Sequence, residues 1–170
     1  MHTRKSHRLK GWNYASDGAY FITIVTKNRI HLFGEVDQTE VILNQFGELF
    51  LEEWNRSFEM RKELSCDEFI IMPNHLHAIV IIENNEPIPN ANIDLPTLYR
   101  SPRSISSFIA GLKSIVTKRI NEIRNTPGQP VWISRYHDYI IRDEKAYRNI
   151  KRYIQENPIR YSERKKQIGM

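Results

Sequence analysis

Alternating apolar and polar positions mark the strands that the chain is expected to form. Residues 19–26 (AYFITIVT) are rich in aromatic and β-branched side chains, which favour strands. Residues 64–72 and 75–82 predict two further strands, which the turn pair Pro73-Asn74 joins. Because this connection is short, the two strands are expected to form a hairpin of fixed register.

Apolar residues at helical spacing predict two helices in the middle part of the sequence. One covers residues 39–58, with Thr39 as the expected N-cap. The other covers residues 104–124 and ends at the sequence Asn125-Thr126-Pro127-Gly128. Between them, residues 83–102 contain four prolines and no clear period, which predicts a long mobile loop.

The remaining residues predict one more strand and one more helix. The strand is expected within residues 131–142, centred on 136–141. Asp143 then caps a third helix, which runs to about Glu156 and stops before Pro158. The order β-α-β-β-α-β, followed by this helix, indicates an α+β protein. We expect a ferredoxin-like, RRM-like antiparallel sheet with helices on one face and an added C-terminal helix.

Length and cysteine content narrow the class of protein. A chain of 170 residues favours one domain over residues 1–170, with residues 1–17 as a basic N-terminal arm and 159–170 as a basic tail. The single cysteine, Cys66, excludes an intramolecular disulfide and suits a reducing cytosol. The longest apolar run, residues 78–82, is too short to cross a membrane, and no signal peptide is recognisable. A cytoplasmic protein without a membrane partner is therefore expected.

Charge is distributed unevenly along the chain. The formal net charge is +5, but residues 103–170 hold 15 Lys and Arg against 6 Asp and Glu. Residues 11–102 hold 6 basic against 14 acidic side chains, and the first ten residues add four basic ones. This asymmetry favours a polyanionic partner such as nucleic acid at the C-terminal part and the arm. The alternative is a solvated basic surface.

The sequence His75-Leu76-His77 is the sharpest candidate for metal chemistry. On a strand, residues i and i+2 point to the same face, so the two imidazoles can converge on one cation. Ile79 and Val80 stand where a metallo-β-lactamase pattern requires Asp and His. The pattern alone leaves open an ordinary surface pair of histidines.

A second candidate lies on the third predicted helix. Tyr153 and Asn157 are four residues apart and so share a helix face. The nearby tyrosines Tyr136, Tyr139 and Tyr147 are rivals, but Tyr153 alone has an amide one helical turn further on. The alternatives are that Tyr153 is a tyrosine at the edge of the core and that Asn157 is a helix C-cap.

Taken together, these motifs resemble the REP-associated tyrosine transposases, a group of HUH single-strand nucleases. The resemblance covers almost the whole chain, from Arg8 to Pro158, and rests on motif order and spacing. Its motifs are Met72-Pro73-Asn74-His75-Leu76-His77, Trp132, Tyr136-His137-Asp138 and Tyr153-Ile154-x-x-Asn157-Pro158. It implies that His75 and His77 bind Mg²⁺ or Mn²⁺, that Asn157 is a third metal ligand, and that Tyr153 is the nucleophile.

The resemblance also implies a reaction and a partner. The expected enzyme is a transposase and endonuclease that recognises a sequence and a hairpin in single-stranded DNA. It cleaves and rejoins strands through a 5′-phosphotyrosine, on targets with palindromic hairpins, as a monomer or a homodimer. Two alternatives remain. One is a non-catalytic hairpin-binding module on the same fold, and the other is a metal-dependent hydrolase in which water attacks.

Basic residues supply the expected DNA contacts. Lys113, Lys118 and Arg119 lie on the polar side of the predicted helix 104–124, and Arg135 and Arg142 bracket the strand before the tyrosine helix. In the family that the chain resembles, the N-terminal arm helps to read a guide sequence. The matching basic residues here are Arg8 and Lys10, and the aromatic residues that could stack on unpaired bases are Trp12, Tyr14 and Trp132. For Trp132, packing in the core is the alternative.

Overall fold

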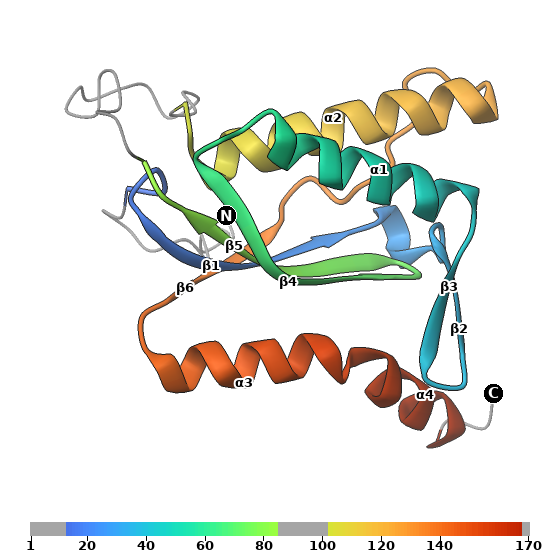
Figure 1. The fold of residues 1–170 in the computed structure, drawn as a ribbon. Helices are drawn as coiled ribbons and strands as arrows, with labels where there is room; N and C mark the ends of the chain where they lie inside the picture. The colour runs from blue at the N-terminus through green and yellow to red at the C-terminus, as the bar shows by residue number, and fades with distance from the viewer. Residues whose placement is uncertain (1–12, 85–101, 168–170) are drawn as a thin grey trace, which may run out of the picture.

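A four-stranded antiparallel sheet forms the centre of the protein. The computed structural model describes residues 13–84 and 102–167. Helices α1 and α2 cover one face of the sheet, and α3 lies on the other (Figure 1). The strands, in the order in which they pair, are β4 (Leu64–Met72), β5 (His75–Ile82), β1 (Gly18–Val25) and β6 (His137–Ile141). The helices are α1 (Gln45–Glu59), α2 (Ile105–Arg124), α3 (Glu144–Gln155) and α4 (Asn157–Gln167).

This topology confirms the predicted α+β, ferredoxin-like fold. Strand β1 lies in the middle of the sheet and pairs antiparallel with both β5 and β6. The predicted hairpin is formed by β4 and β5, with Met72 opposite His75 across the Pro73-Asn74 turn. Strand β6 occupies residues 137–141 of the wider predicted range, and Trp132 forms an isolated bridge with Thr26 before it begins.

Strand β5 is apolar on both sides because helices cover both faces of the sheet. Leu76, Ala78 and Val80 are fully buried in the core beneath α1 and α2. The alternate positions, which include His75 and His77, face α3. The strand that carries the two histidines is therefore anchored from both sides.

The predicted helix 39–58 begins later than expected, and Thr39 as its N-cap is wrong. Residues before it form a small hairpin of β2 (Gly34–Asp37) and β3 (Glu40–Leu43), with Thr39 in the turn. The N-cap is Asn44, whose side-chain oxygen accepts hydrogen bonds from the backbone N–H groups of Phe46 and Gly47. Its amide nitrogen also donates to the Leu32 carbonyl, at 3.0 Å. Asn44 thus satisfies helix donors and ties the helix to the preceding chain.

Replacing Asn44 by alanine is expected to destabilise the fold by about 1–2 kcal/mol, because the cap bonds are lost. Thr39→Ala is the matched control and should change the stability by less than about 0.5 kcal/mol, since Thr39 is an exposed turn residue. Urea denaturation followed by circular dichroism measures both. Equal effects of the two substitutions would contradict the assignment of Asn44 as the cap.

The C-terminal residues form a helix rather than an extension of α3. As predicted, α3 stops before Pro158, but Glu156 is its C-cap. The interpretation of Asn157 as a C-cap is therefore wrong, because Asn157 begins α4. Pro158 lies in the first turn of α4, where no backbone N–H is needed. The expected basic tail thus forms helix as far as Gln167.

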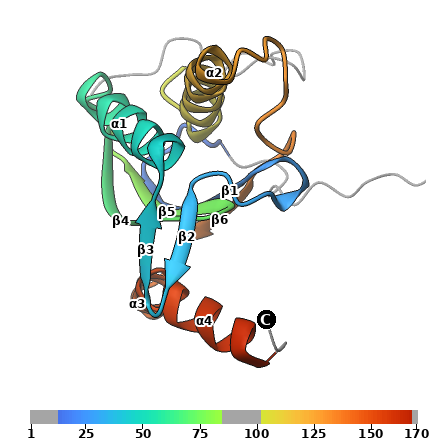
Figure 2. The ribbon, with the colours of Figure 1, turned by 90° about the vertical axis from the view of Figure 1, so that its right-hand side faces the viewer.

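Helix α4 packs against the β2–β3 hairpin (Figure 2). The hydroxyl of Tyr161 lies 3.2 Å from Nε2 of His31, and the Ser162 hydroxyl donates to the carbonyl of Gln38. These contacts hold the break between α3 and α4 at one end of the sheet, beside the turn that precedes β5.

Parts of the sequence-based predictions lie outside the described residues. These are Arg8, Lys10 and Trp12 of the arm and nearly all of the predicted loop 83–102. In the described part of the chain, no helix combines the length and apolar character that a membrane span requires.

Candidate active site

The fold brings together the four residues that the sequence singled out for chemistry. His75 and His77 lie on β5, Tyr153 on α3 and Asn157 at the start of α4. The Tyr153 hydroxyl is 3.3 Å from Nε2 of His77, and the centroids of the two imidazole rings are 4.6 Å apart. The side chain of Asn157 lies close enough to His75 to interact with its imidazole. Residues 76 positions apart in sequence thus form one cluster on the α3 face of the sheet.

Neighbouring side chains fix the orientation of both imidazoles. His75 donates its Nδ1–H to the Asn74 side-chain oxygen at 2.6 Å, because an amide oxygen can only accept. His77 places Nδ1 2.8 Å from the hydroxyl of Thr23 on β1. Thr23 and His77 are cross-strand partners in the β1–β5 pairing. The Nε2 atom of His75 therefore carries a lone pair. When Nδ1–H of His77 donates to the Thr23 hydroxyl, Nε2 of His77 carries a lone pair as well.

Burial keeps the two imidazoles neutral. Desolvation, with a smaller contribution from the positive charge of Arg29, lowers the pKa of His75 to about 4. Desolvation and the adjacent His75 lower the pKa of His77 to about 3. Near neutral pH, both rings are thus unprotonated and available as ligands or hydrogen-bond acceptors.

Aromatic packing positions the Tyr153 ring beside His77. Phe21 on β1 stacks on His77 with a centroid distance of 5.3 Å and meets Tyr153 edge-on at 6.2 Å. From α4, the guanidinium of Arg160 lies 5.7 Å from the centre of the Tyr153 ring. Contacts from a strand and from the next helix therefore hold the ring in place.

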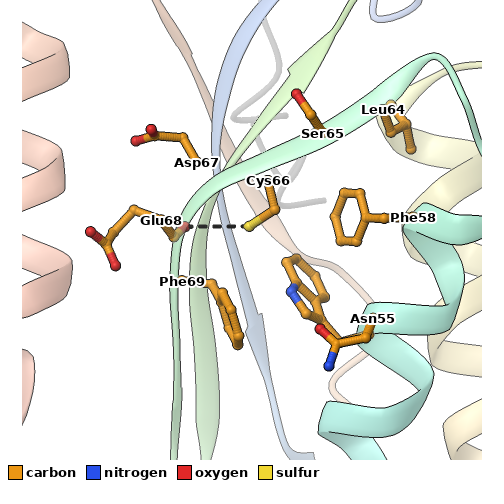
Figure 3. A pocket seen from close by; sticks show the side chains of 9 residues that line it. Asn55, Phe58, Leu64, Ser65, Cys66, Asp67, Glu68 and Phe69 are labelled. Atoms are coloured by element: carbon orange, nitrogen blue, oxygen red, sulfur yellow. Dashed lines mark hydrogen bonds between the residues drawn. The ribbon is translucent and has the colours of Figure 1, made fainter.

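A β-bulge in β4 contacts α3 on both sides of Tyr153 along the helix. The register shifts between Cys66 and Glu68, so Asp67 is an extra residue in the strand. Figure 3 shows Asp67 and Glu68 both directed away from α1, toward α3. Asp67 binds the ammonium of Lys151 at 2.9 Å, and Glu68 accepts from the amide of Gln155 at 2.7 Å. These two contacts flank Tyr153 along the helix.

On the other side of the same bulge lies a cavity of about 500 Å³ between α1 and β4 (Figure 3). Cys66 points into it, and its thiol donates a weak hydrogen bond to the Glu68 carbonyl at 3.7 Å. Burial, reinforced by the charge of Asp67, raises the pKa of Cys66 to about 12. Cys66 is thus protonated and offers no nucleophile.

The rival tyrosines lie outside the cluster. The hydroxyl of Tyr136 is 3.3 Å from that of Ser106 on α2, and Tyr139 is 53% exposed on β6. Desolvation and a hydrogen bond with Asp67 raise the pKa of Tyr147 to about 12, which disfavours the phenolate. Tyr153 alone of the four contacts a histidine of the pair in the described structure.

The predicted DNA contacts on α2 lie across the sheet from this cluster (Figure 1). Arg119 pairs with Glu52 and Glu53 of α1, and Lys113 donates to the Ile133 carbonyl at 2.7 Å. Lys118 lies 3.9 Å from Glu122 at the helix surface. Contacts of these three residues with DNA remain predictions, but Arg119 and Lys113 have structural roles here.

The other predicted contacts divide into surface and core. Arg135 and Arg142 are exposed on either side of β6, the strand next to β1. Trp132 is buried, and the centroid of its ring lies 5.3 Å from that of Phe33 and 5.2 Å from that of Phe50. Core packing is therefore the correct interpretation of Trp132. Tyr14 is partly buried, and the centroid of its ring lies 6.2 Å from that of Tyr20.

Sequence reasoning did not identify Thr23, Phe21 or the Asp67–Glu68 bulge as parts of the site. The alternation in residues 19–26 puts Phe21 and Thr23 on one face, but only the pairing register shows that this is the face of His77. The acidic pair Asp67 and Glu68 interrupts an otherwise apolar strand, and that was the available signal for the bulge.

The chain has the fold of a solved REP-associated tyrosine transposase bound to a REP hairpin, with a TM-score of 0.61 and 17% sequence identity. That alignment covers 95% of this chain and 74% of the other. The predicted resemblance is thus confirmed in the fold.

A curated relative defines the family more closely. A Haemophilus influenzae protein, described as uncharacterized, is 40% identical over an alignment of 165 residues that covers 94% of this chain and 90% of the relative. The chain therefore belongs to the same family as this Haemophilus protein. No family model matches the chain.

Proposed function

We propose that the protein is a metal-dependent transesterase of single-stranded DNA in which Tyr153 is the nucleophile. The observation that carries the proposal is the 3.3 Å contact between the Tyr153 hydroxyl and the buried, neutral His77. A binding module has no need of a phenol held beside two oriented imidazoles. The fold shared with a transposase that binds a REP hairpin supports the same class of reaction.

The donor atoms in the cluster fit a divalent cation. His75 and His77 are neutral, and their hydrogen bonds with Asn74 and Thr23 orient the rings as ligating histidines require. Among the described residues, no group of three or more His, Cys, Asp and Glu side chains could hold a metal ion. The resemblance to the tyrosine transposases would make the Asn157 amide oxygen the third protein ligand. With Mg²⁺ or Mn²⁺ bound, these uncharged ligands would leave the cation its full charge to polarise a phosphate.

The chemistry of Tyr153 follows from its phenol group. Its oxygen forms a bond to the phosphorus of a DNA phosphodiester, and the bond from phosphorus to the 3′ oxygen breaks. The phenol loses its proton, and the departing oxygen gains one to become a 3′-hydroxyl. The product is a 5′-phosphotyrosine, which retains the phosphodiester bond energy. A free 3′-hydroxyl can therefore attack it and rejoin strands without ATP.

The substrate class follows from charge and from the structural neighbour. Residues 103–170, which supply α2, β6, α3 and α4, hold 15 basic against 6 acidic side chains, as a polyanionic substrate requires. The solved transposase with the same fold is bound to a REP hairpin. We propose single-stranded DNA that contains palindromic hairpins as the substrate.

The test is a denaturing gel combined with peptide mapping. The protein is incubated with labelled hairpin oligonucleotides, with Mn²⁺ or with EDTA. Trypsin then releases residues 153–160 (YIQENPIR), in which Tyr153 is the single tyrosine. A metal-dependent adduct on this peptide would establish the proposal. Cleavage without an adduct would support a hydrolase that uses water, and binding without cleavage would support a hairpin-binding module.

Thr23→Val should weaken metal binding by about 10–100-fold without unfolding the protein. Valine keeps the shape of threonine but cannot hydrogen-bond to Nδ1 of His77, so the imidazole loses its orienting partner. Titration calorimetry with Mn²⁺ measures the affinity, and Thr23→Ser, which keeps the hydroxyl, is the matched control. Wild-type affinity in Thr23→Val would show that this bond does not support metal binding.

A further inference from the structure

A second cavity, of about 700 Å³, opens between the turn that follows β1 and the segment that precedes β6. One wall is the turn Lys27–Arg29, which directly follows β1 and its neighbour Thr26. The other wall is the segment that leads toward β6, with lining residues Pro130, Trp132, Ile133 and Ser134. No step of the reaction proposed above uses these residues.

The backbone of the turn is held in an unusual conformation. Asn28 and Arg29 have φ angles of 55° and 54°, in the left-handed region that arginine rarely adopts. The Lys27 N–H donates to the Val131 carbonyl at 2.7 Å, which joins the two walls. A strained turn persists only where surrounding contacts impose it, and such turns gather at binding sites.

The charge of the cavity suits an anion. Lys27 and Arg29 are exposed, and the described lining contains no carboxylate. Within residues 13–84 and 102–167, neither side chain forms an ion pair, in contrast to Arg119 on α2, which pairs with two glutamates. Arginine and lysine together are the usual protein ligands of a phosphate group.

Asn74 connects this turn to the histidine pair. Its amide nitrogen donates to the Arg29 carbonyl at 3.2 Å, and its amide oxygen accepts from His75 at 2.6 Å. An anion held at the turn would thus lie near the scissile phosphate of a strand bound at the cluster.

We propose that this cavity binds a backbone phosphate of the single-stranded DNA next to the one that is cleaved, with Lys27 and Arg29 as its ligands. The inference rests on the proposed function for the identity of the ligand. Phosphate contacts fix the position of a strand without reading its sequence. Lys27 and Arg29 therefore act in binding and take no part in bond breaking.

The test compares two charge-matched double variants. Lys27→Gln with Arg29→Gln removes both cations and keeps the backbone carbonyl that Asn74 binds. Arg56→Gln with Lys62→Gln removes the same charge from exposed positions at the end of α1. Binding of a labelled oligothymidylate in EDTA is measured by fluorescence anisotropy between about 50 and 200 mM salt. Circular dichroism checks that each variant is folded.

The expected result is a change in salt dependence that is confined to the cavity variant. Loss of two phosphate contacts should reduce the slope of log K against log salt by about 1.4 and weaken binding about tenfold or more at low salt. The control variant should keep the wild-type slope. Equal changes in both variants, or no change in either, would overturn the inference.

The adduct assay separates this inference from the proposed function. If the wild-type protein forms the Tyr153 adduct while the cavity variant binds DNA like the control, this inference alone fails. If the cavity effect on binding is present but no adduct forms on any hairpin, the proposed reaction fails and the phosphate site stands.

Discussion

Replacing Tyr153 by phenylalanine is expected to abolish the covalent protein–DNA adduct. The substitution removes the one atom that would bond to phosphorus, and the loss of a nucleophile lowers turnover on the order of 10⁴-fold or more. The measurement is the initial rate of adduct formation at saturating hairpin DNA with Mn²⁺. The affinity for the same DNA in EDTA should stay within about threefold, because the ring itself remains.

The structure indicates that this variant will fold. The hydroxyl of Tyr153 makes a 3.3 Å contact with His77, whereas the ring packs on Phe21 and beneath Arg160. Tyr161→Phe is the matched control, because Tyr161 lies on the neighbouring helix α4 and the substitution removes a hydroxyl that contacts His31. Adduct formation at the wild-type rate in Tyr153→Phe would assign the nucleophile to another residue. Persistent cleavage without an adduct would identify water as the nucleophile.

The strand pattern predicted the fold and the histidine pair because period-2 alternation is a local property. His75 and His77 share a face wherever the strand is placed, and the short turn before them fixes the hairpin. The hydrogen bond between His77 and Thr23 depends on the register between β1 and β5, which long-range packing determines. No local pattern contains that register.

Helix boundaries and charged faces were harder to predict for a related reason. Thr39 and Asn44 are both good N-cap residues, and Val41 and Ile42 extend the helical period by chance although they lie on β3. A basic residue on the polar side of a helix can face solvent or the carboxylates of another helix. Arg119 does the latter, since Glu52 and Glu53 of α1 lie opposite it.

His75→Ala should remove the metal-induced stabilisation of the protein. A ligand at 100 times its dissociation constant stabilises the native state by about 2.7 kcal/mol, which is a rise in Tm of roughly 5–10 °C for a chain of this length. Alanine deletes one of the two imidazoles that would ligate the metal under the proposed function, so the affinity should fall by more than about 100-fold. Differential scanning fluorimetry with Mn²⁺ and with EDTA measures the shift, and adduct formation should be lost in parallel.

His137→Ala is the matched control for this variant. His137 is exposed on β6, which β1 separates from the two histidines of β5, so its loss should leave the Mn²⁺-induced rise in Tm unchanged. Equal loss of the shift in both variants would indicate general binding of Mn²⁺ to histidines. A retained shift in His75→Ala would remove His75 from the ligand set.

Because the shift in Tm is measured without DNA, it tests the metal site independently of the nucleophile. A metal-induced shift that needs His75, together with an adduct that needs Tyr153, would establish two separate parts of one active site.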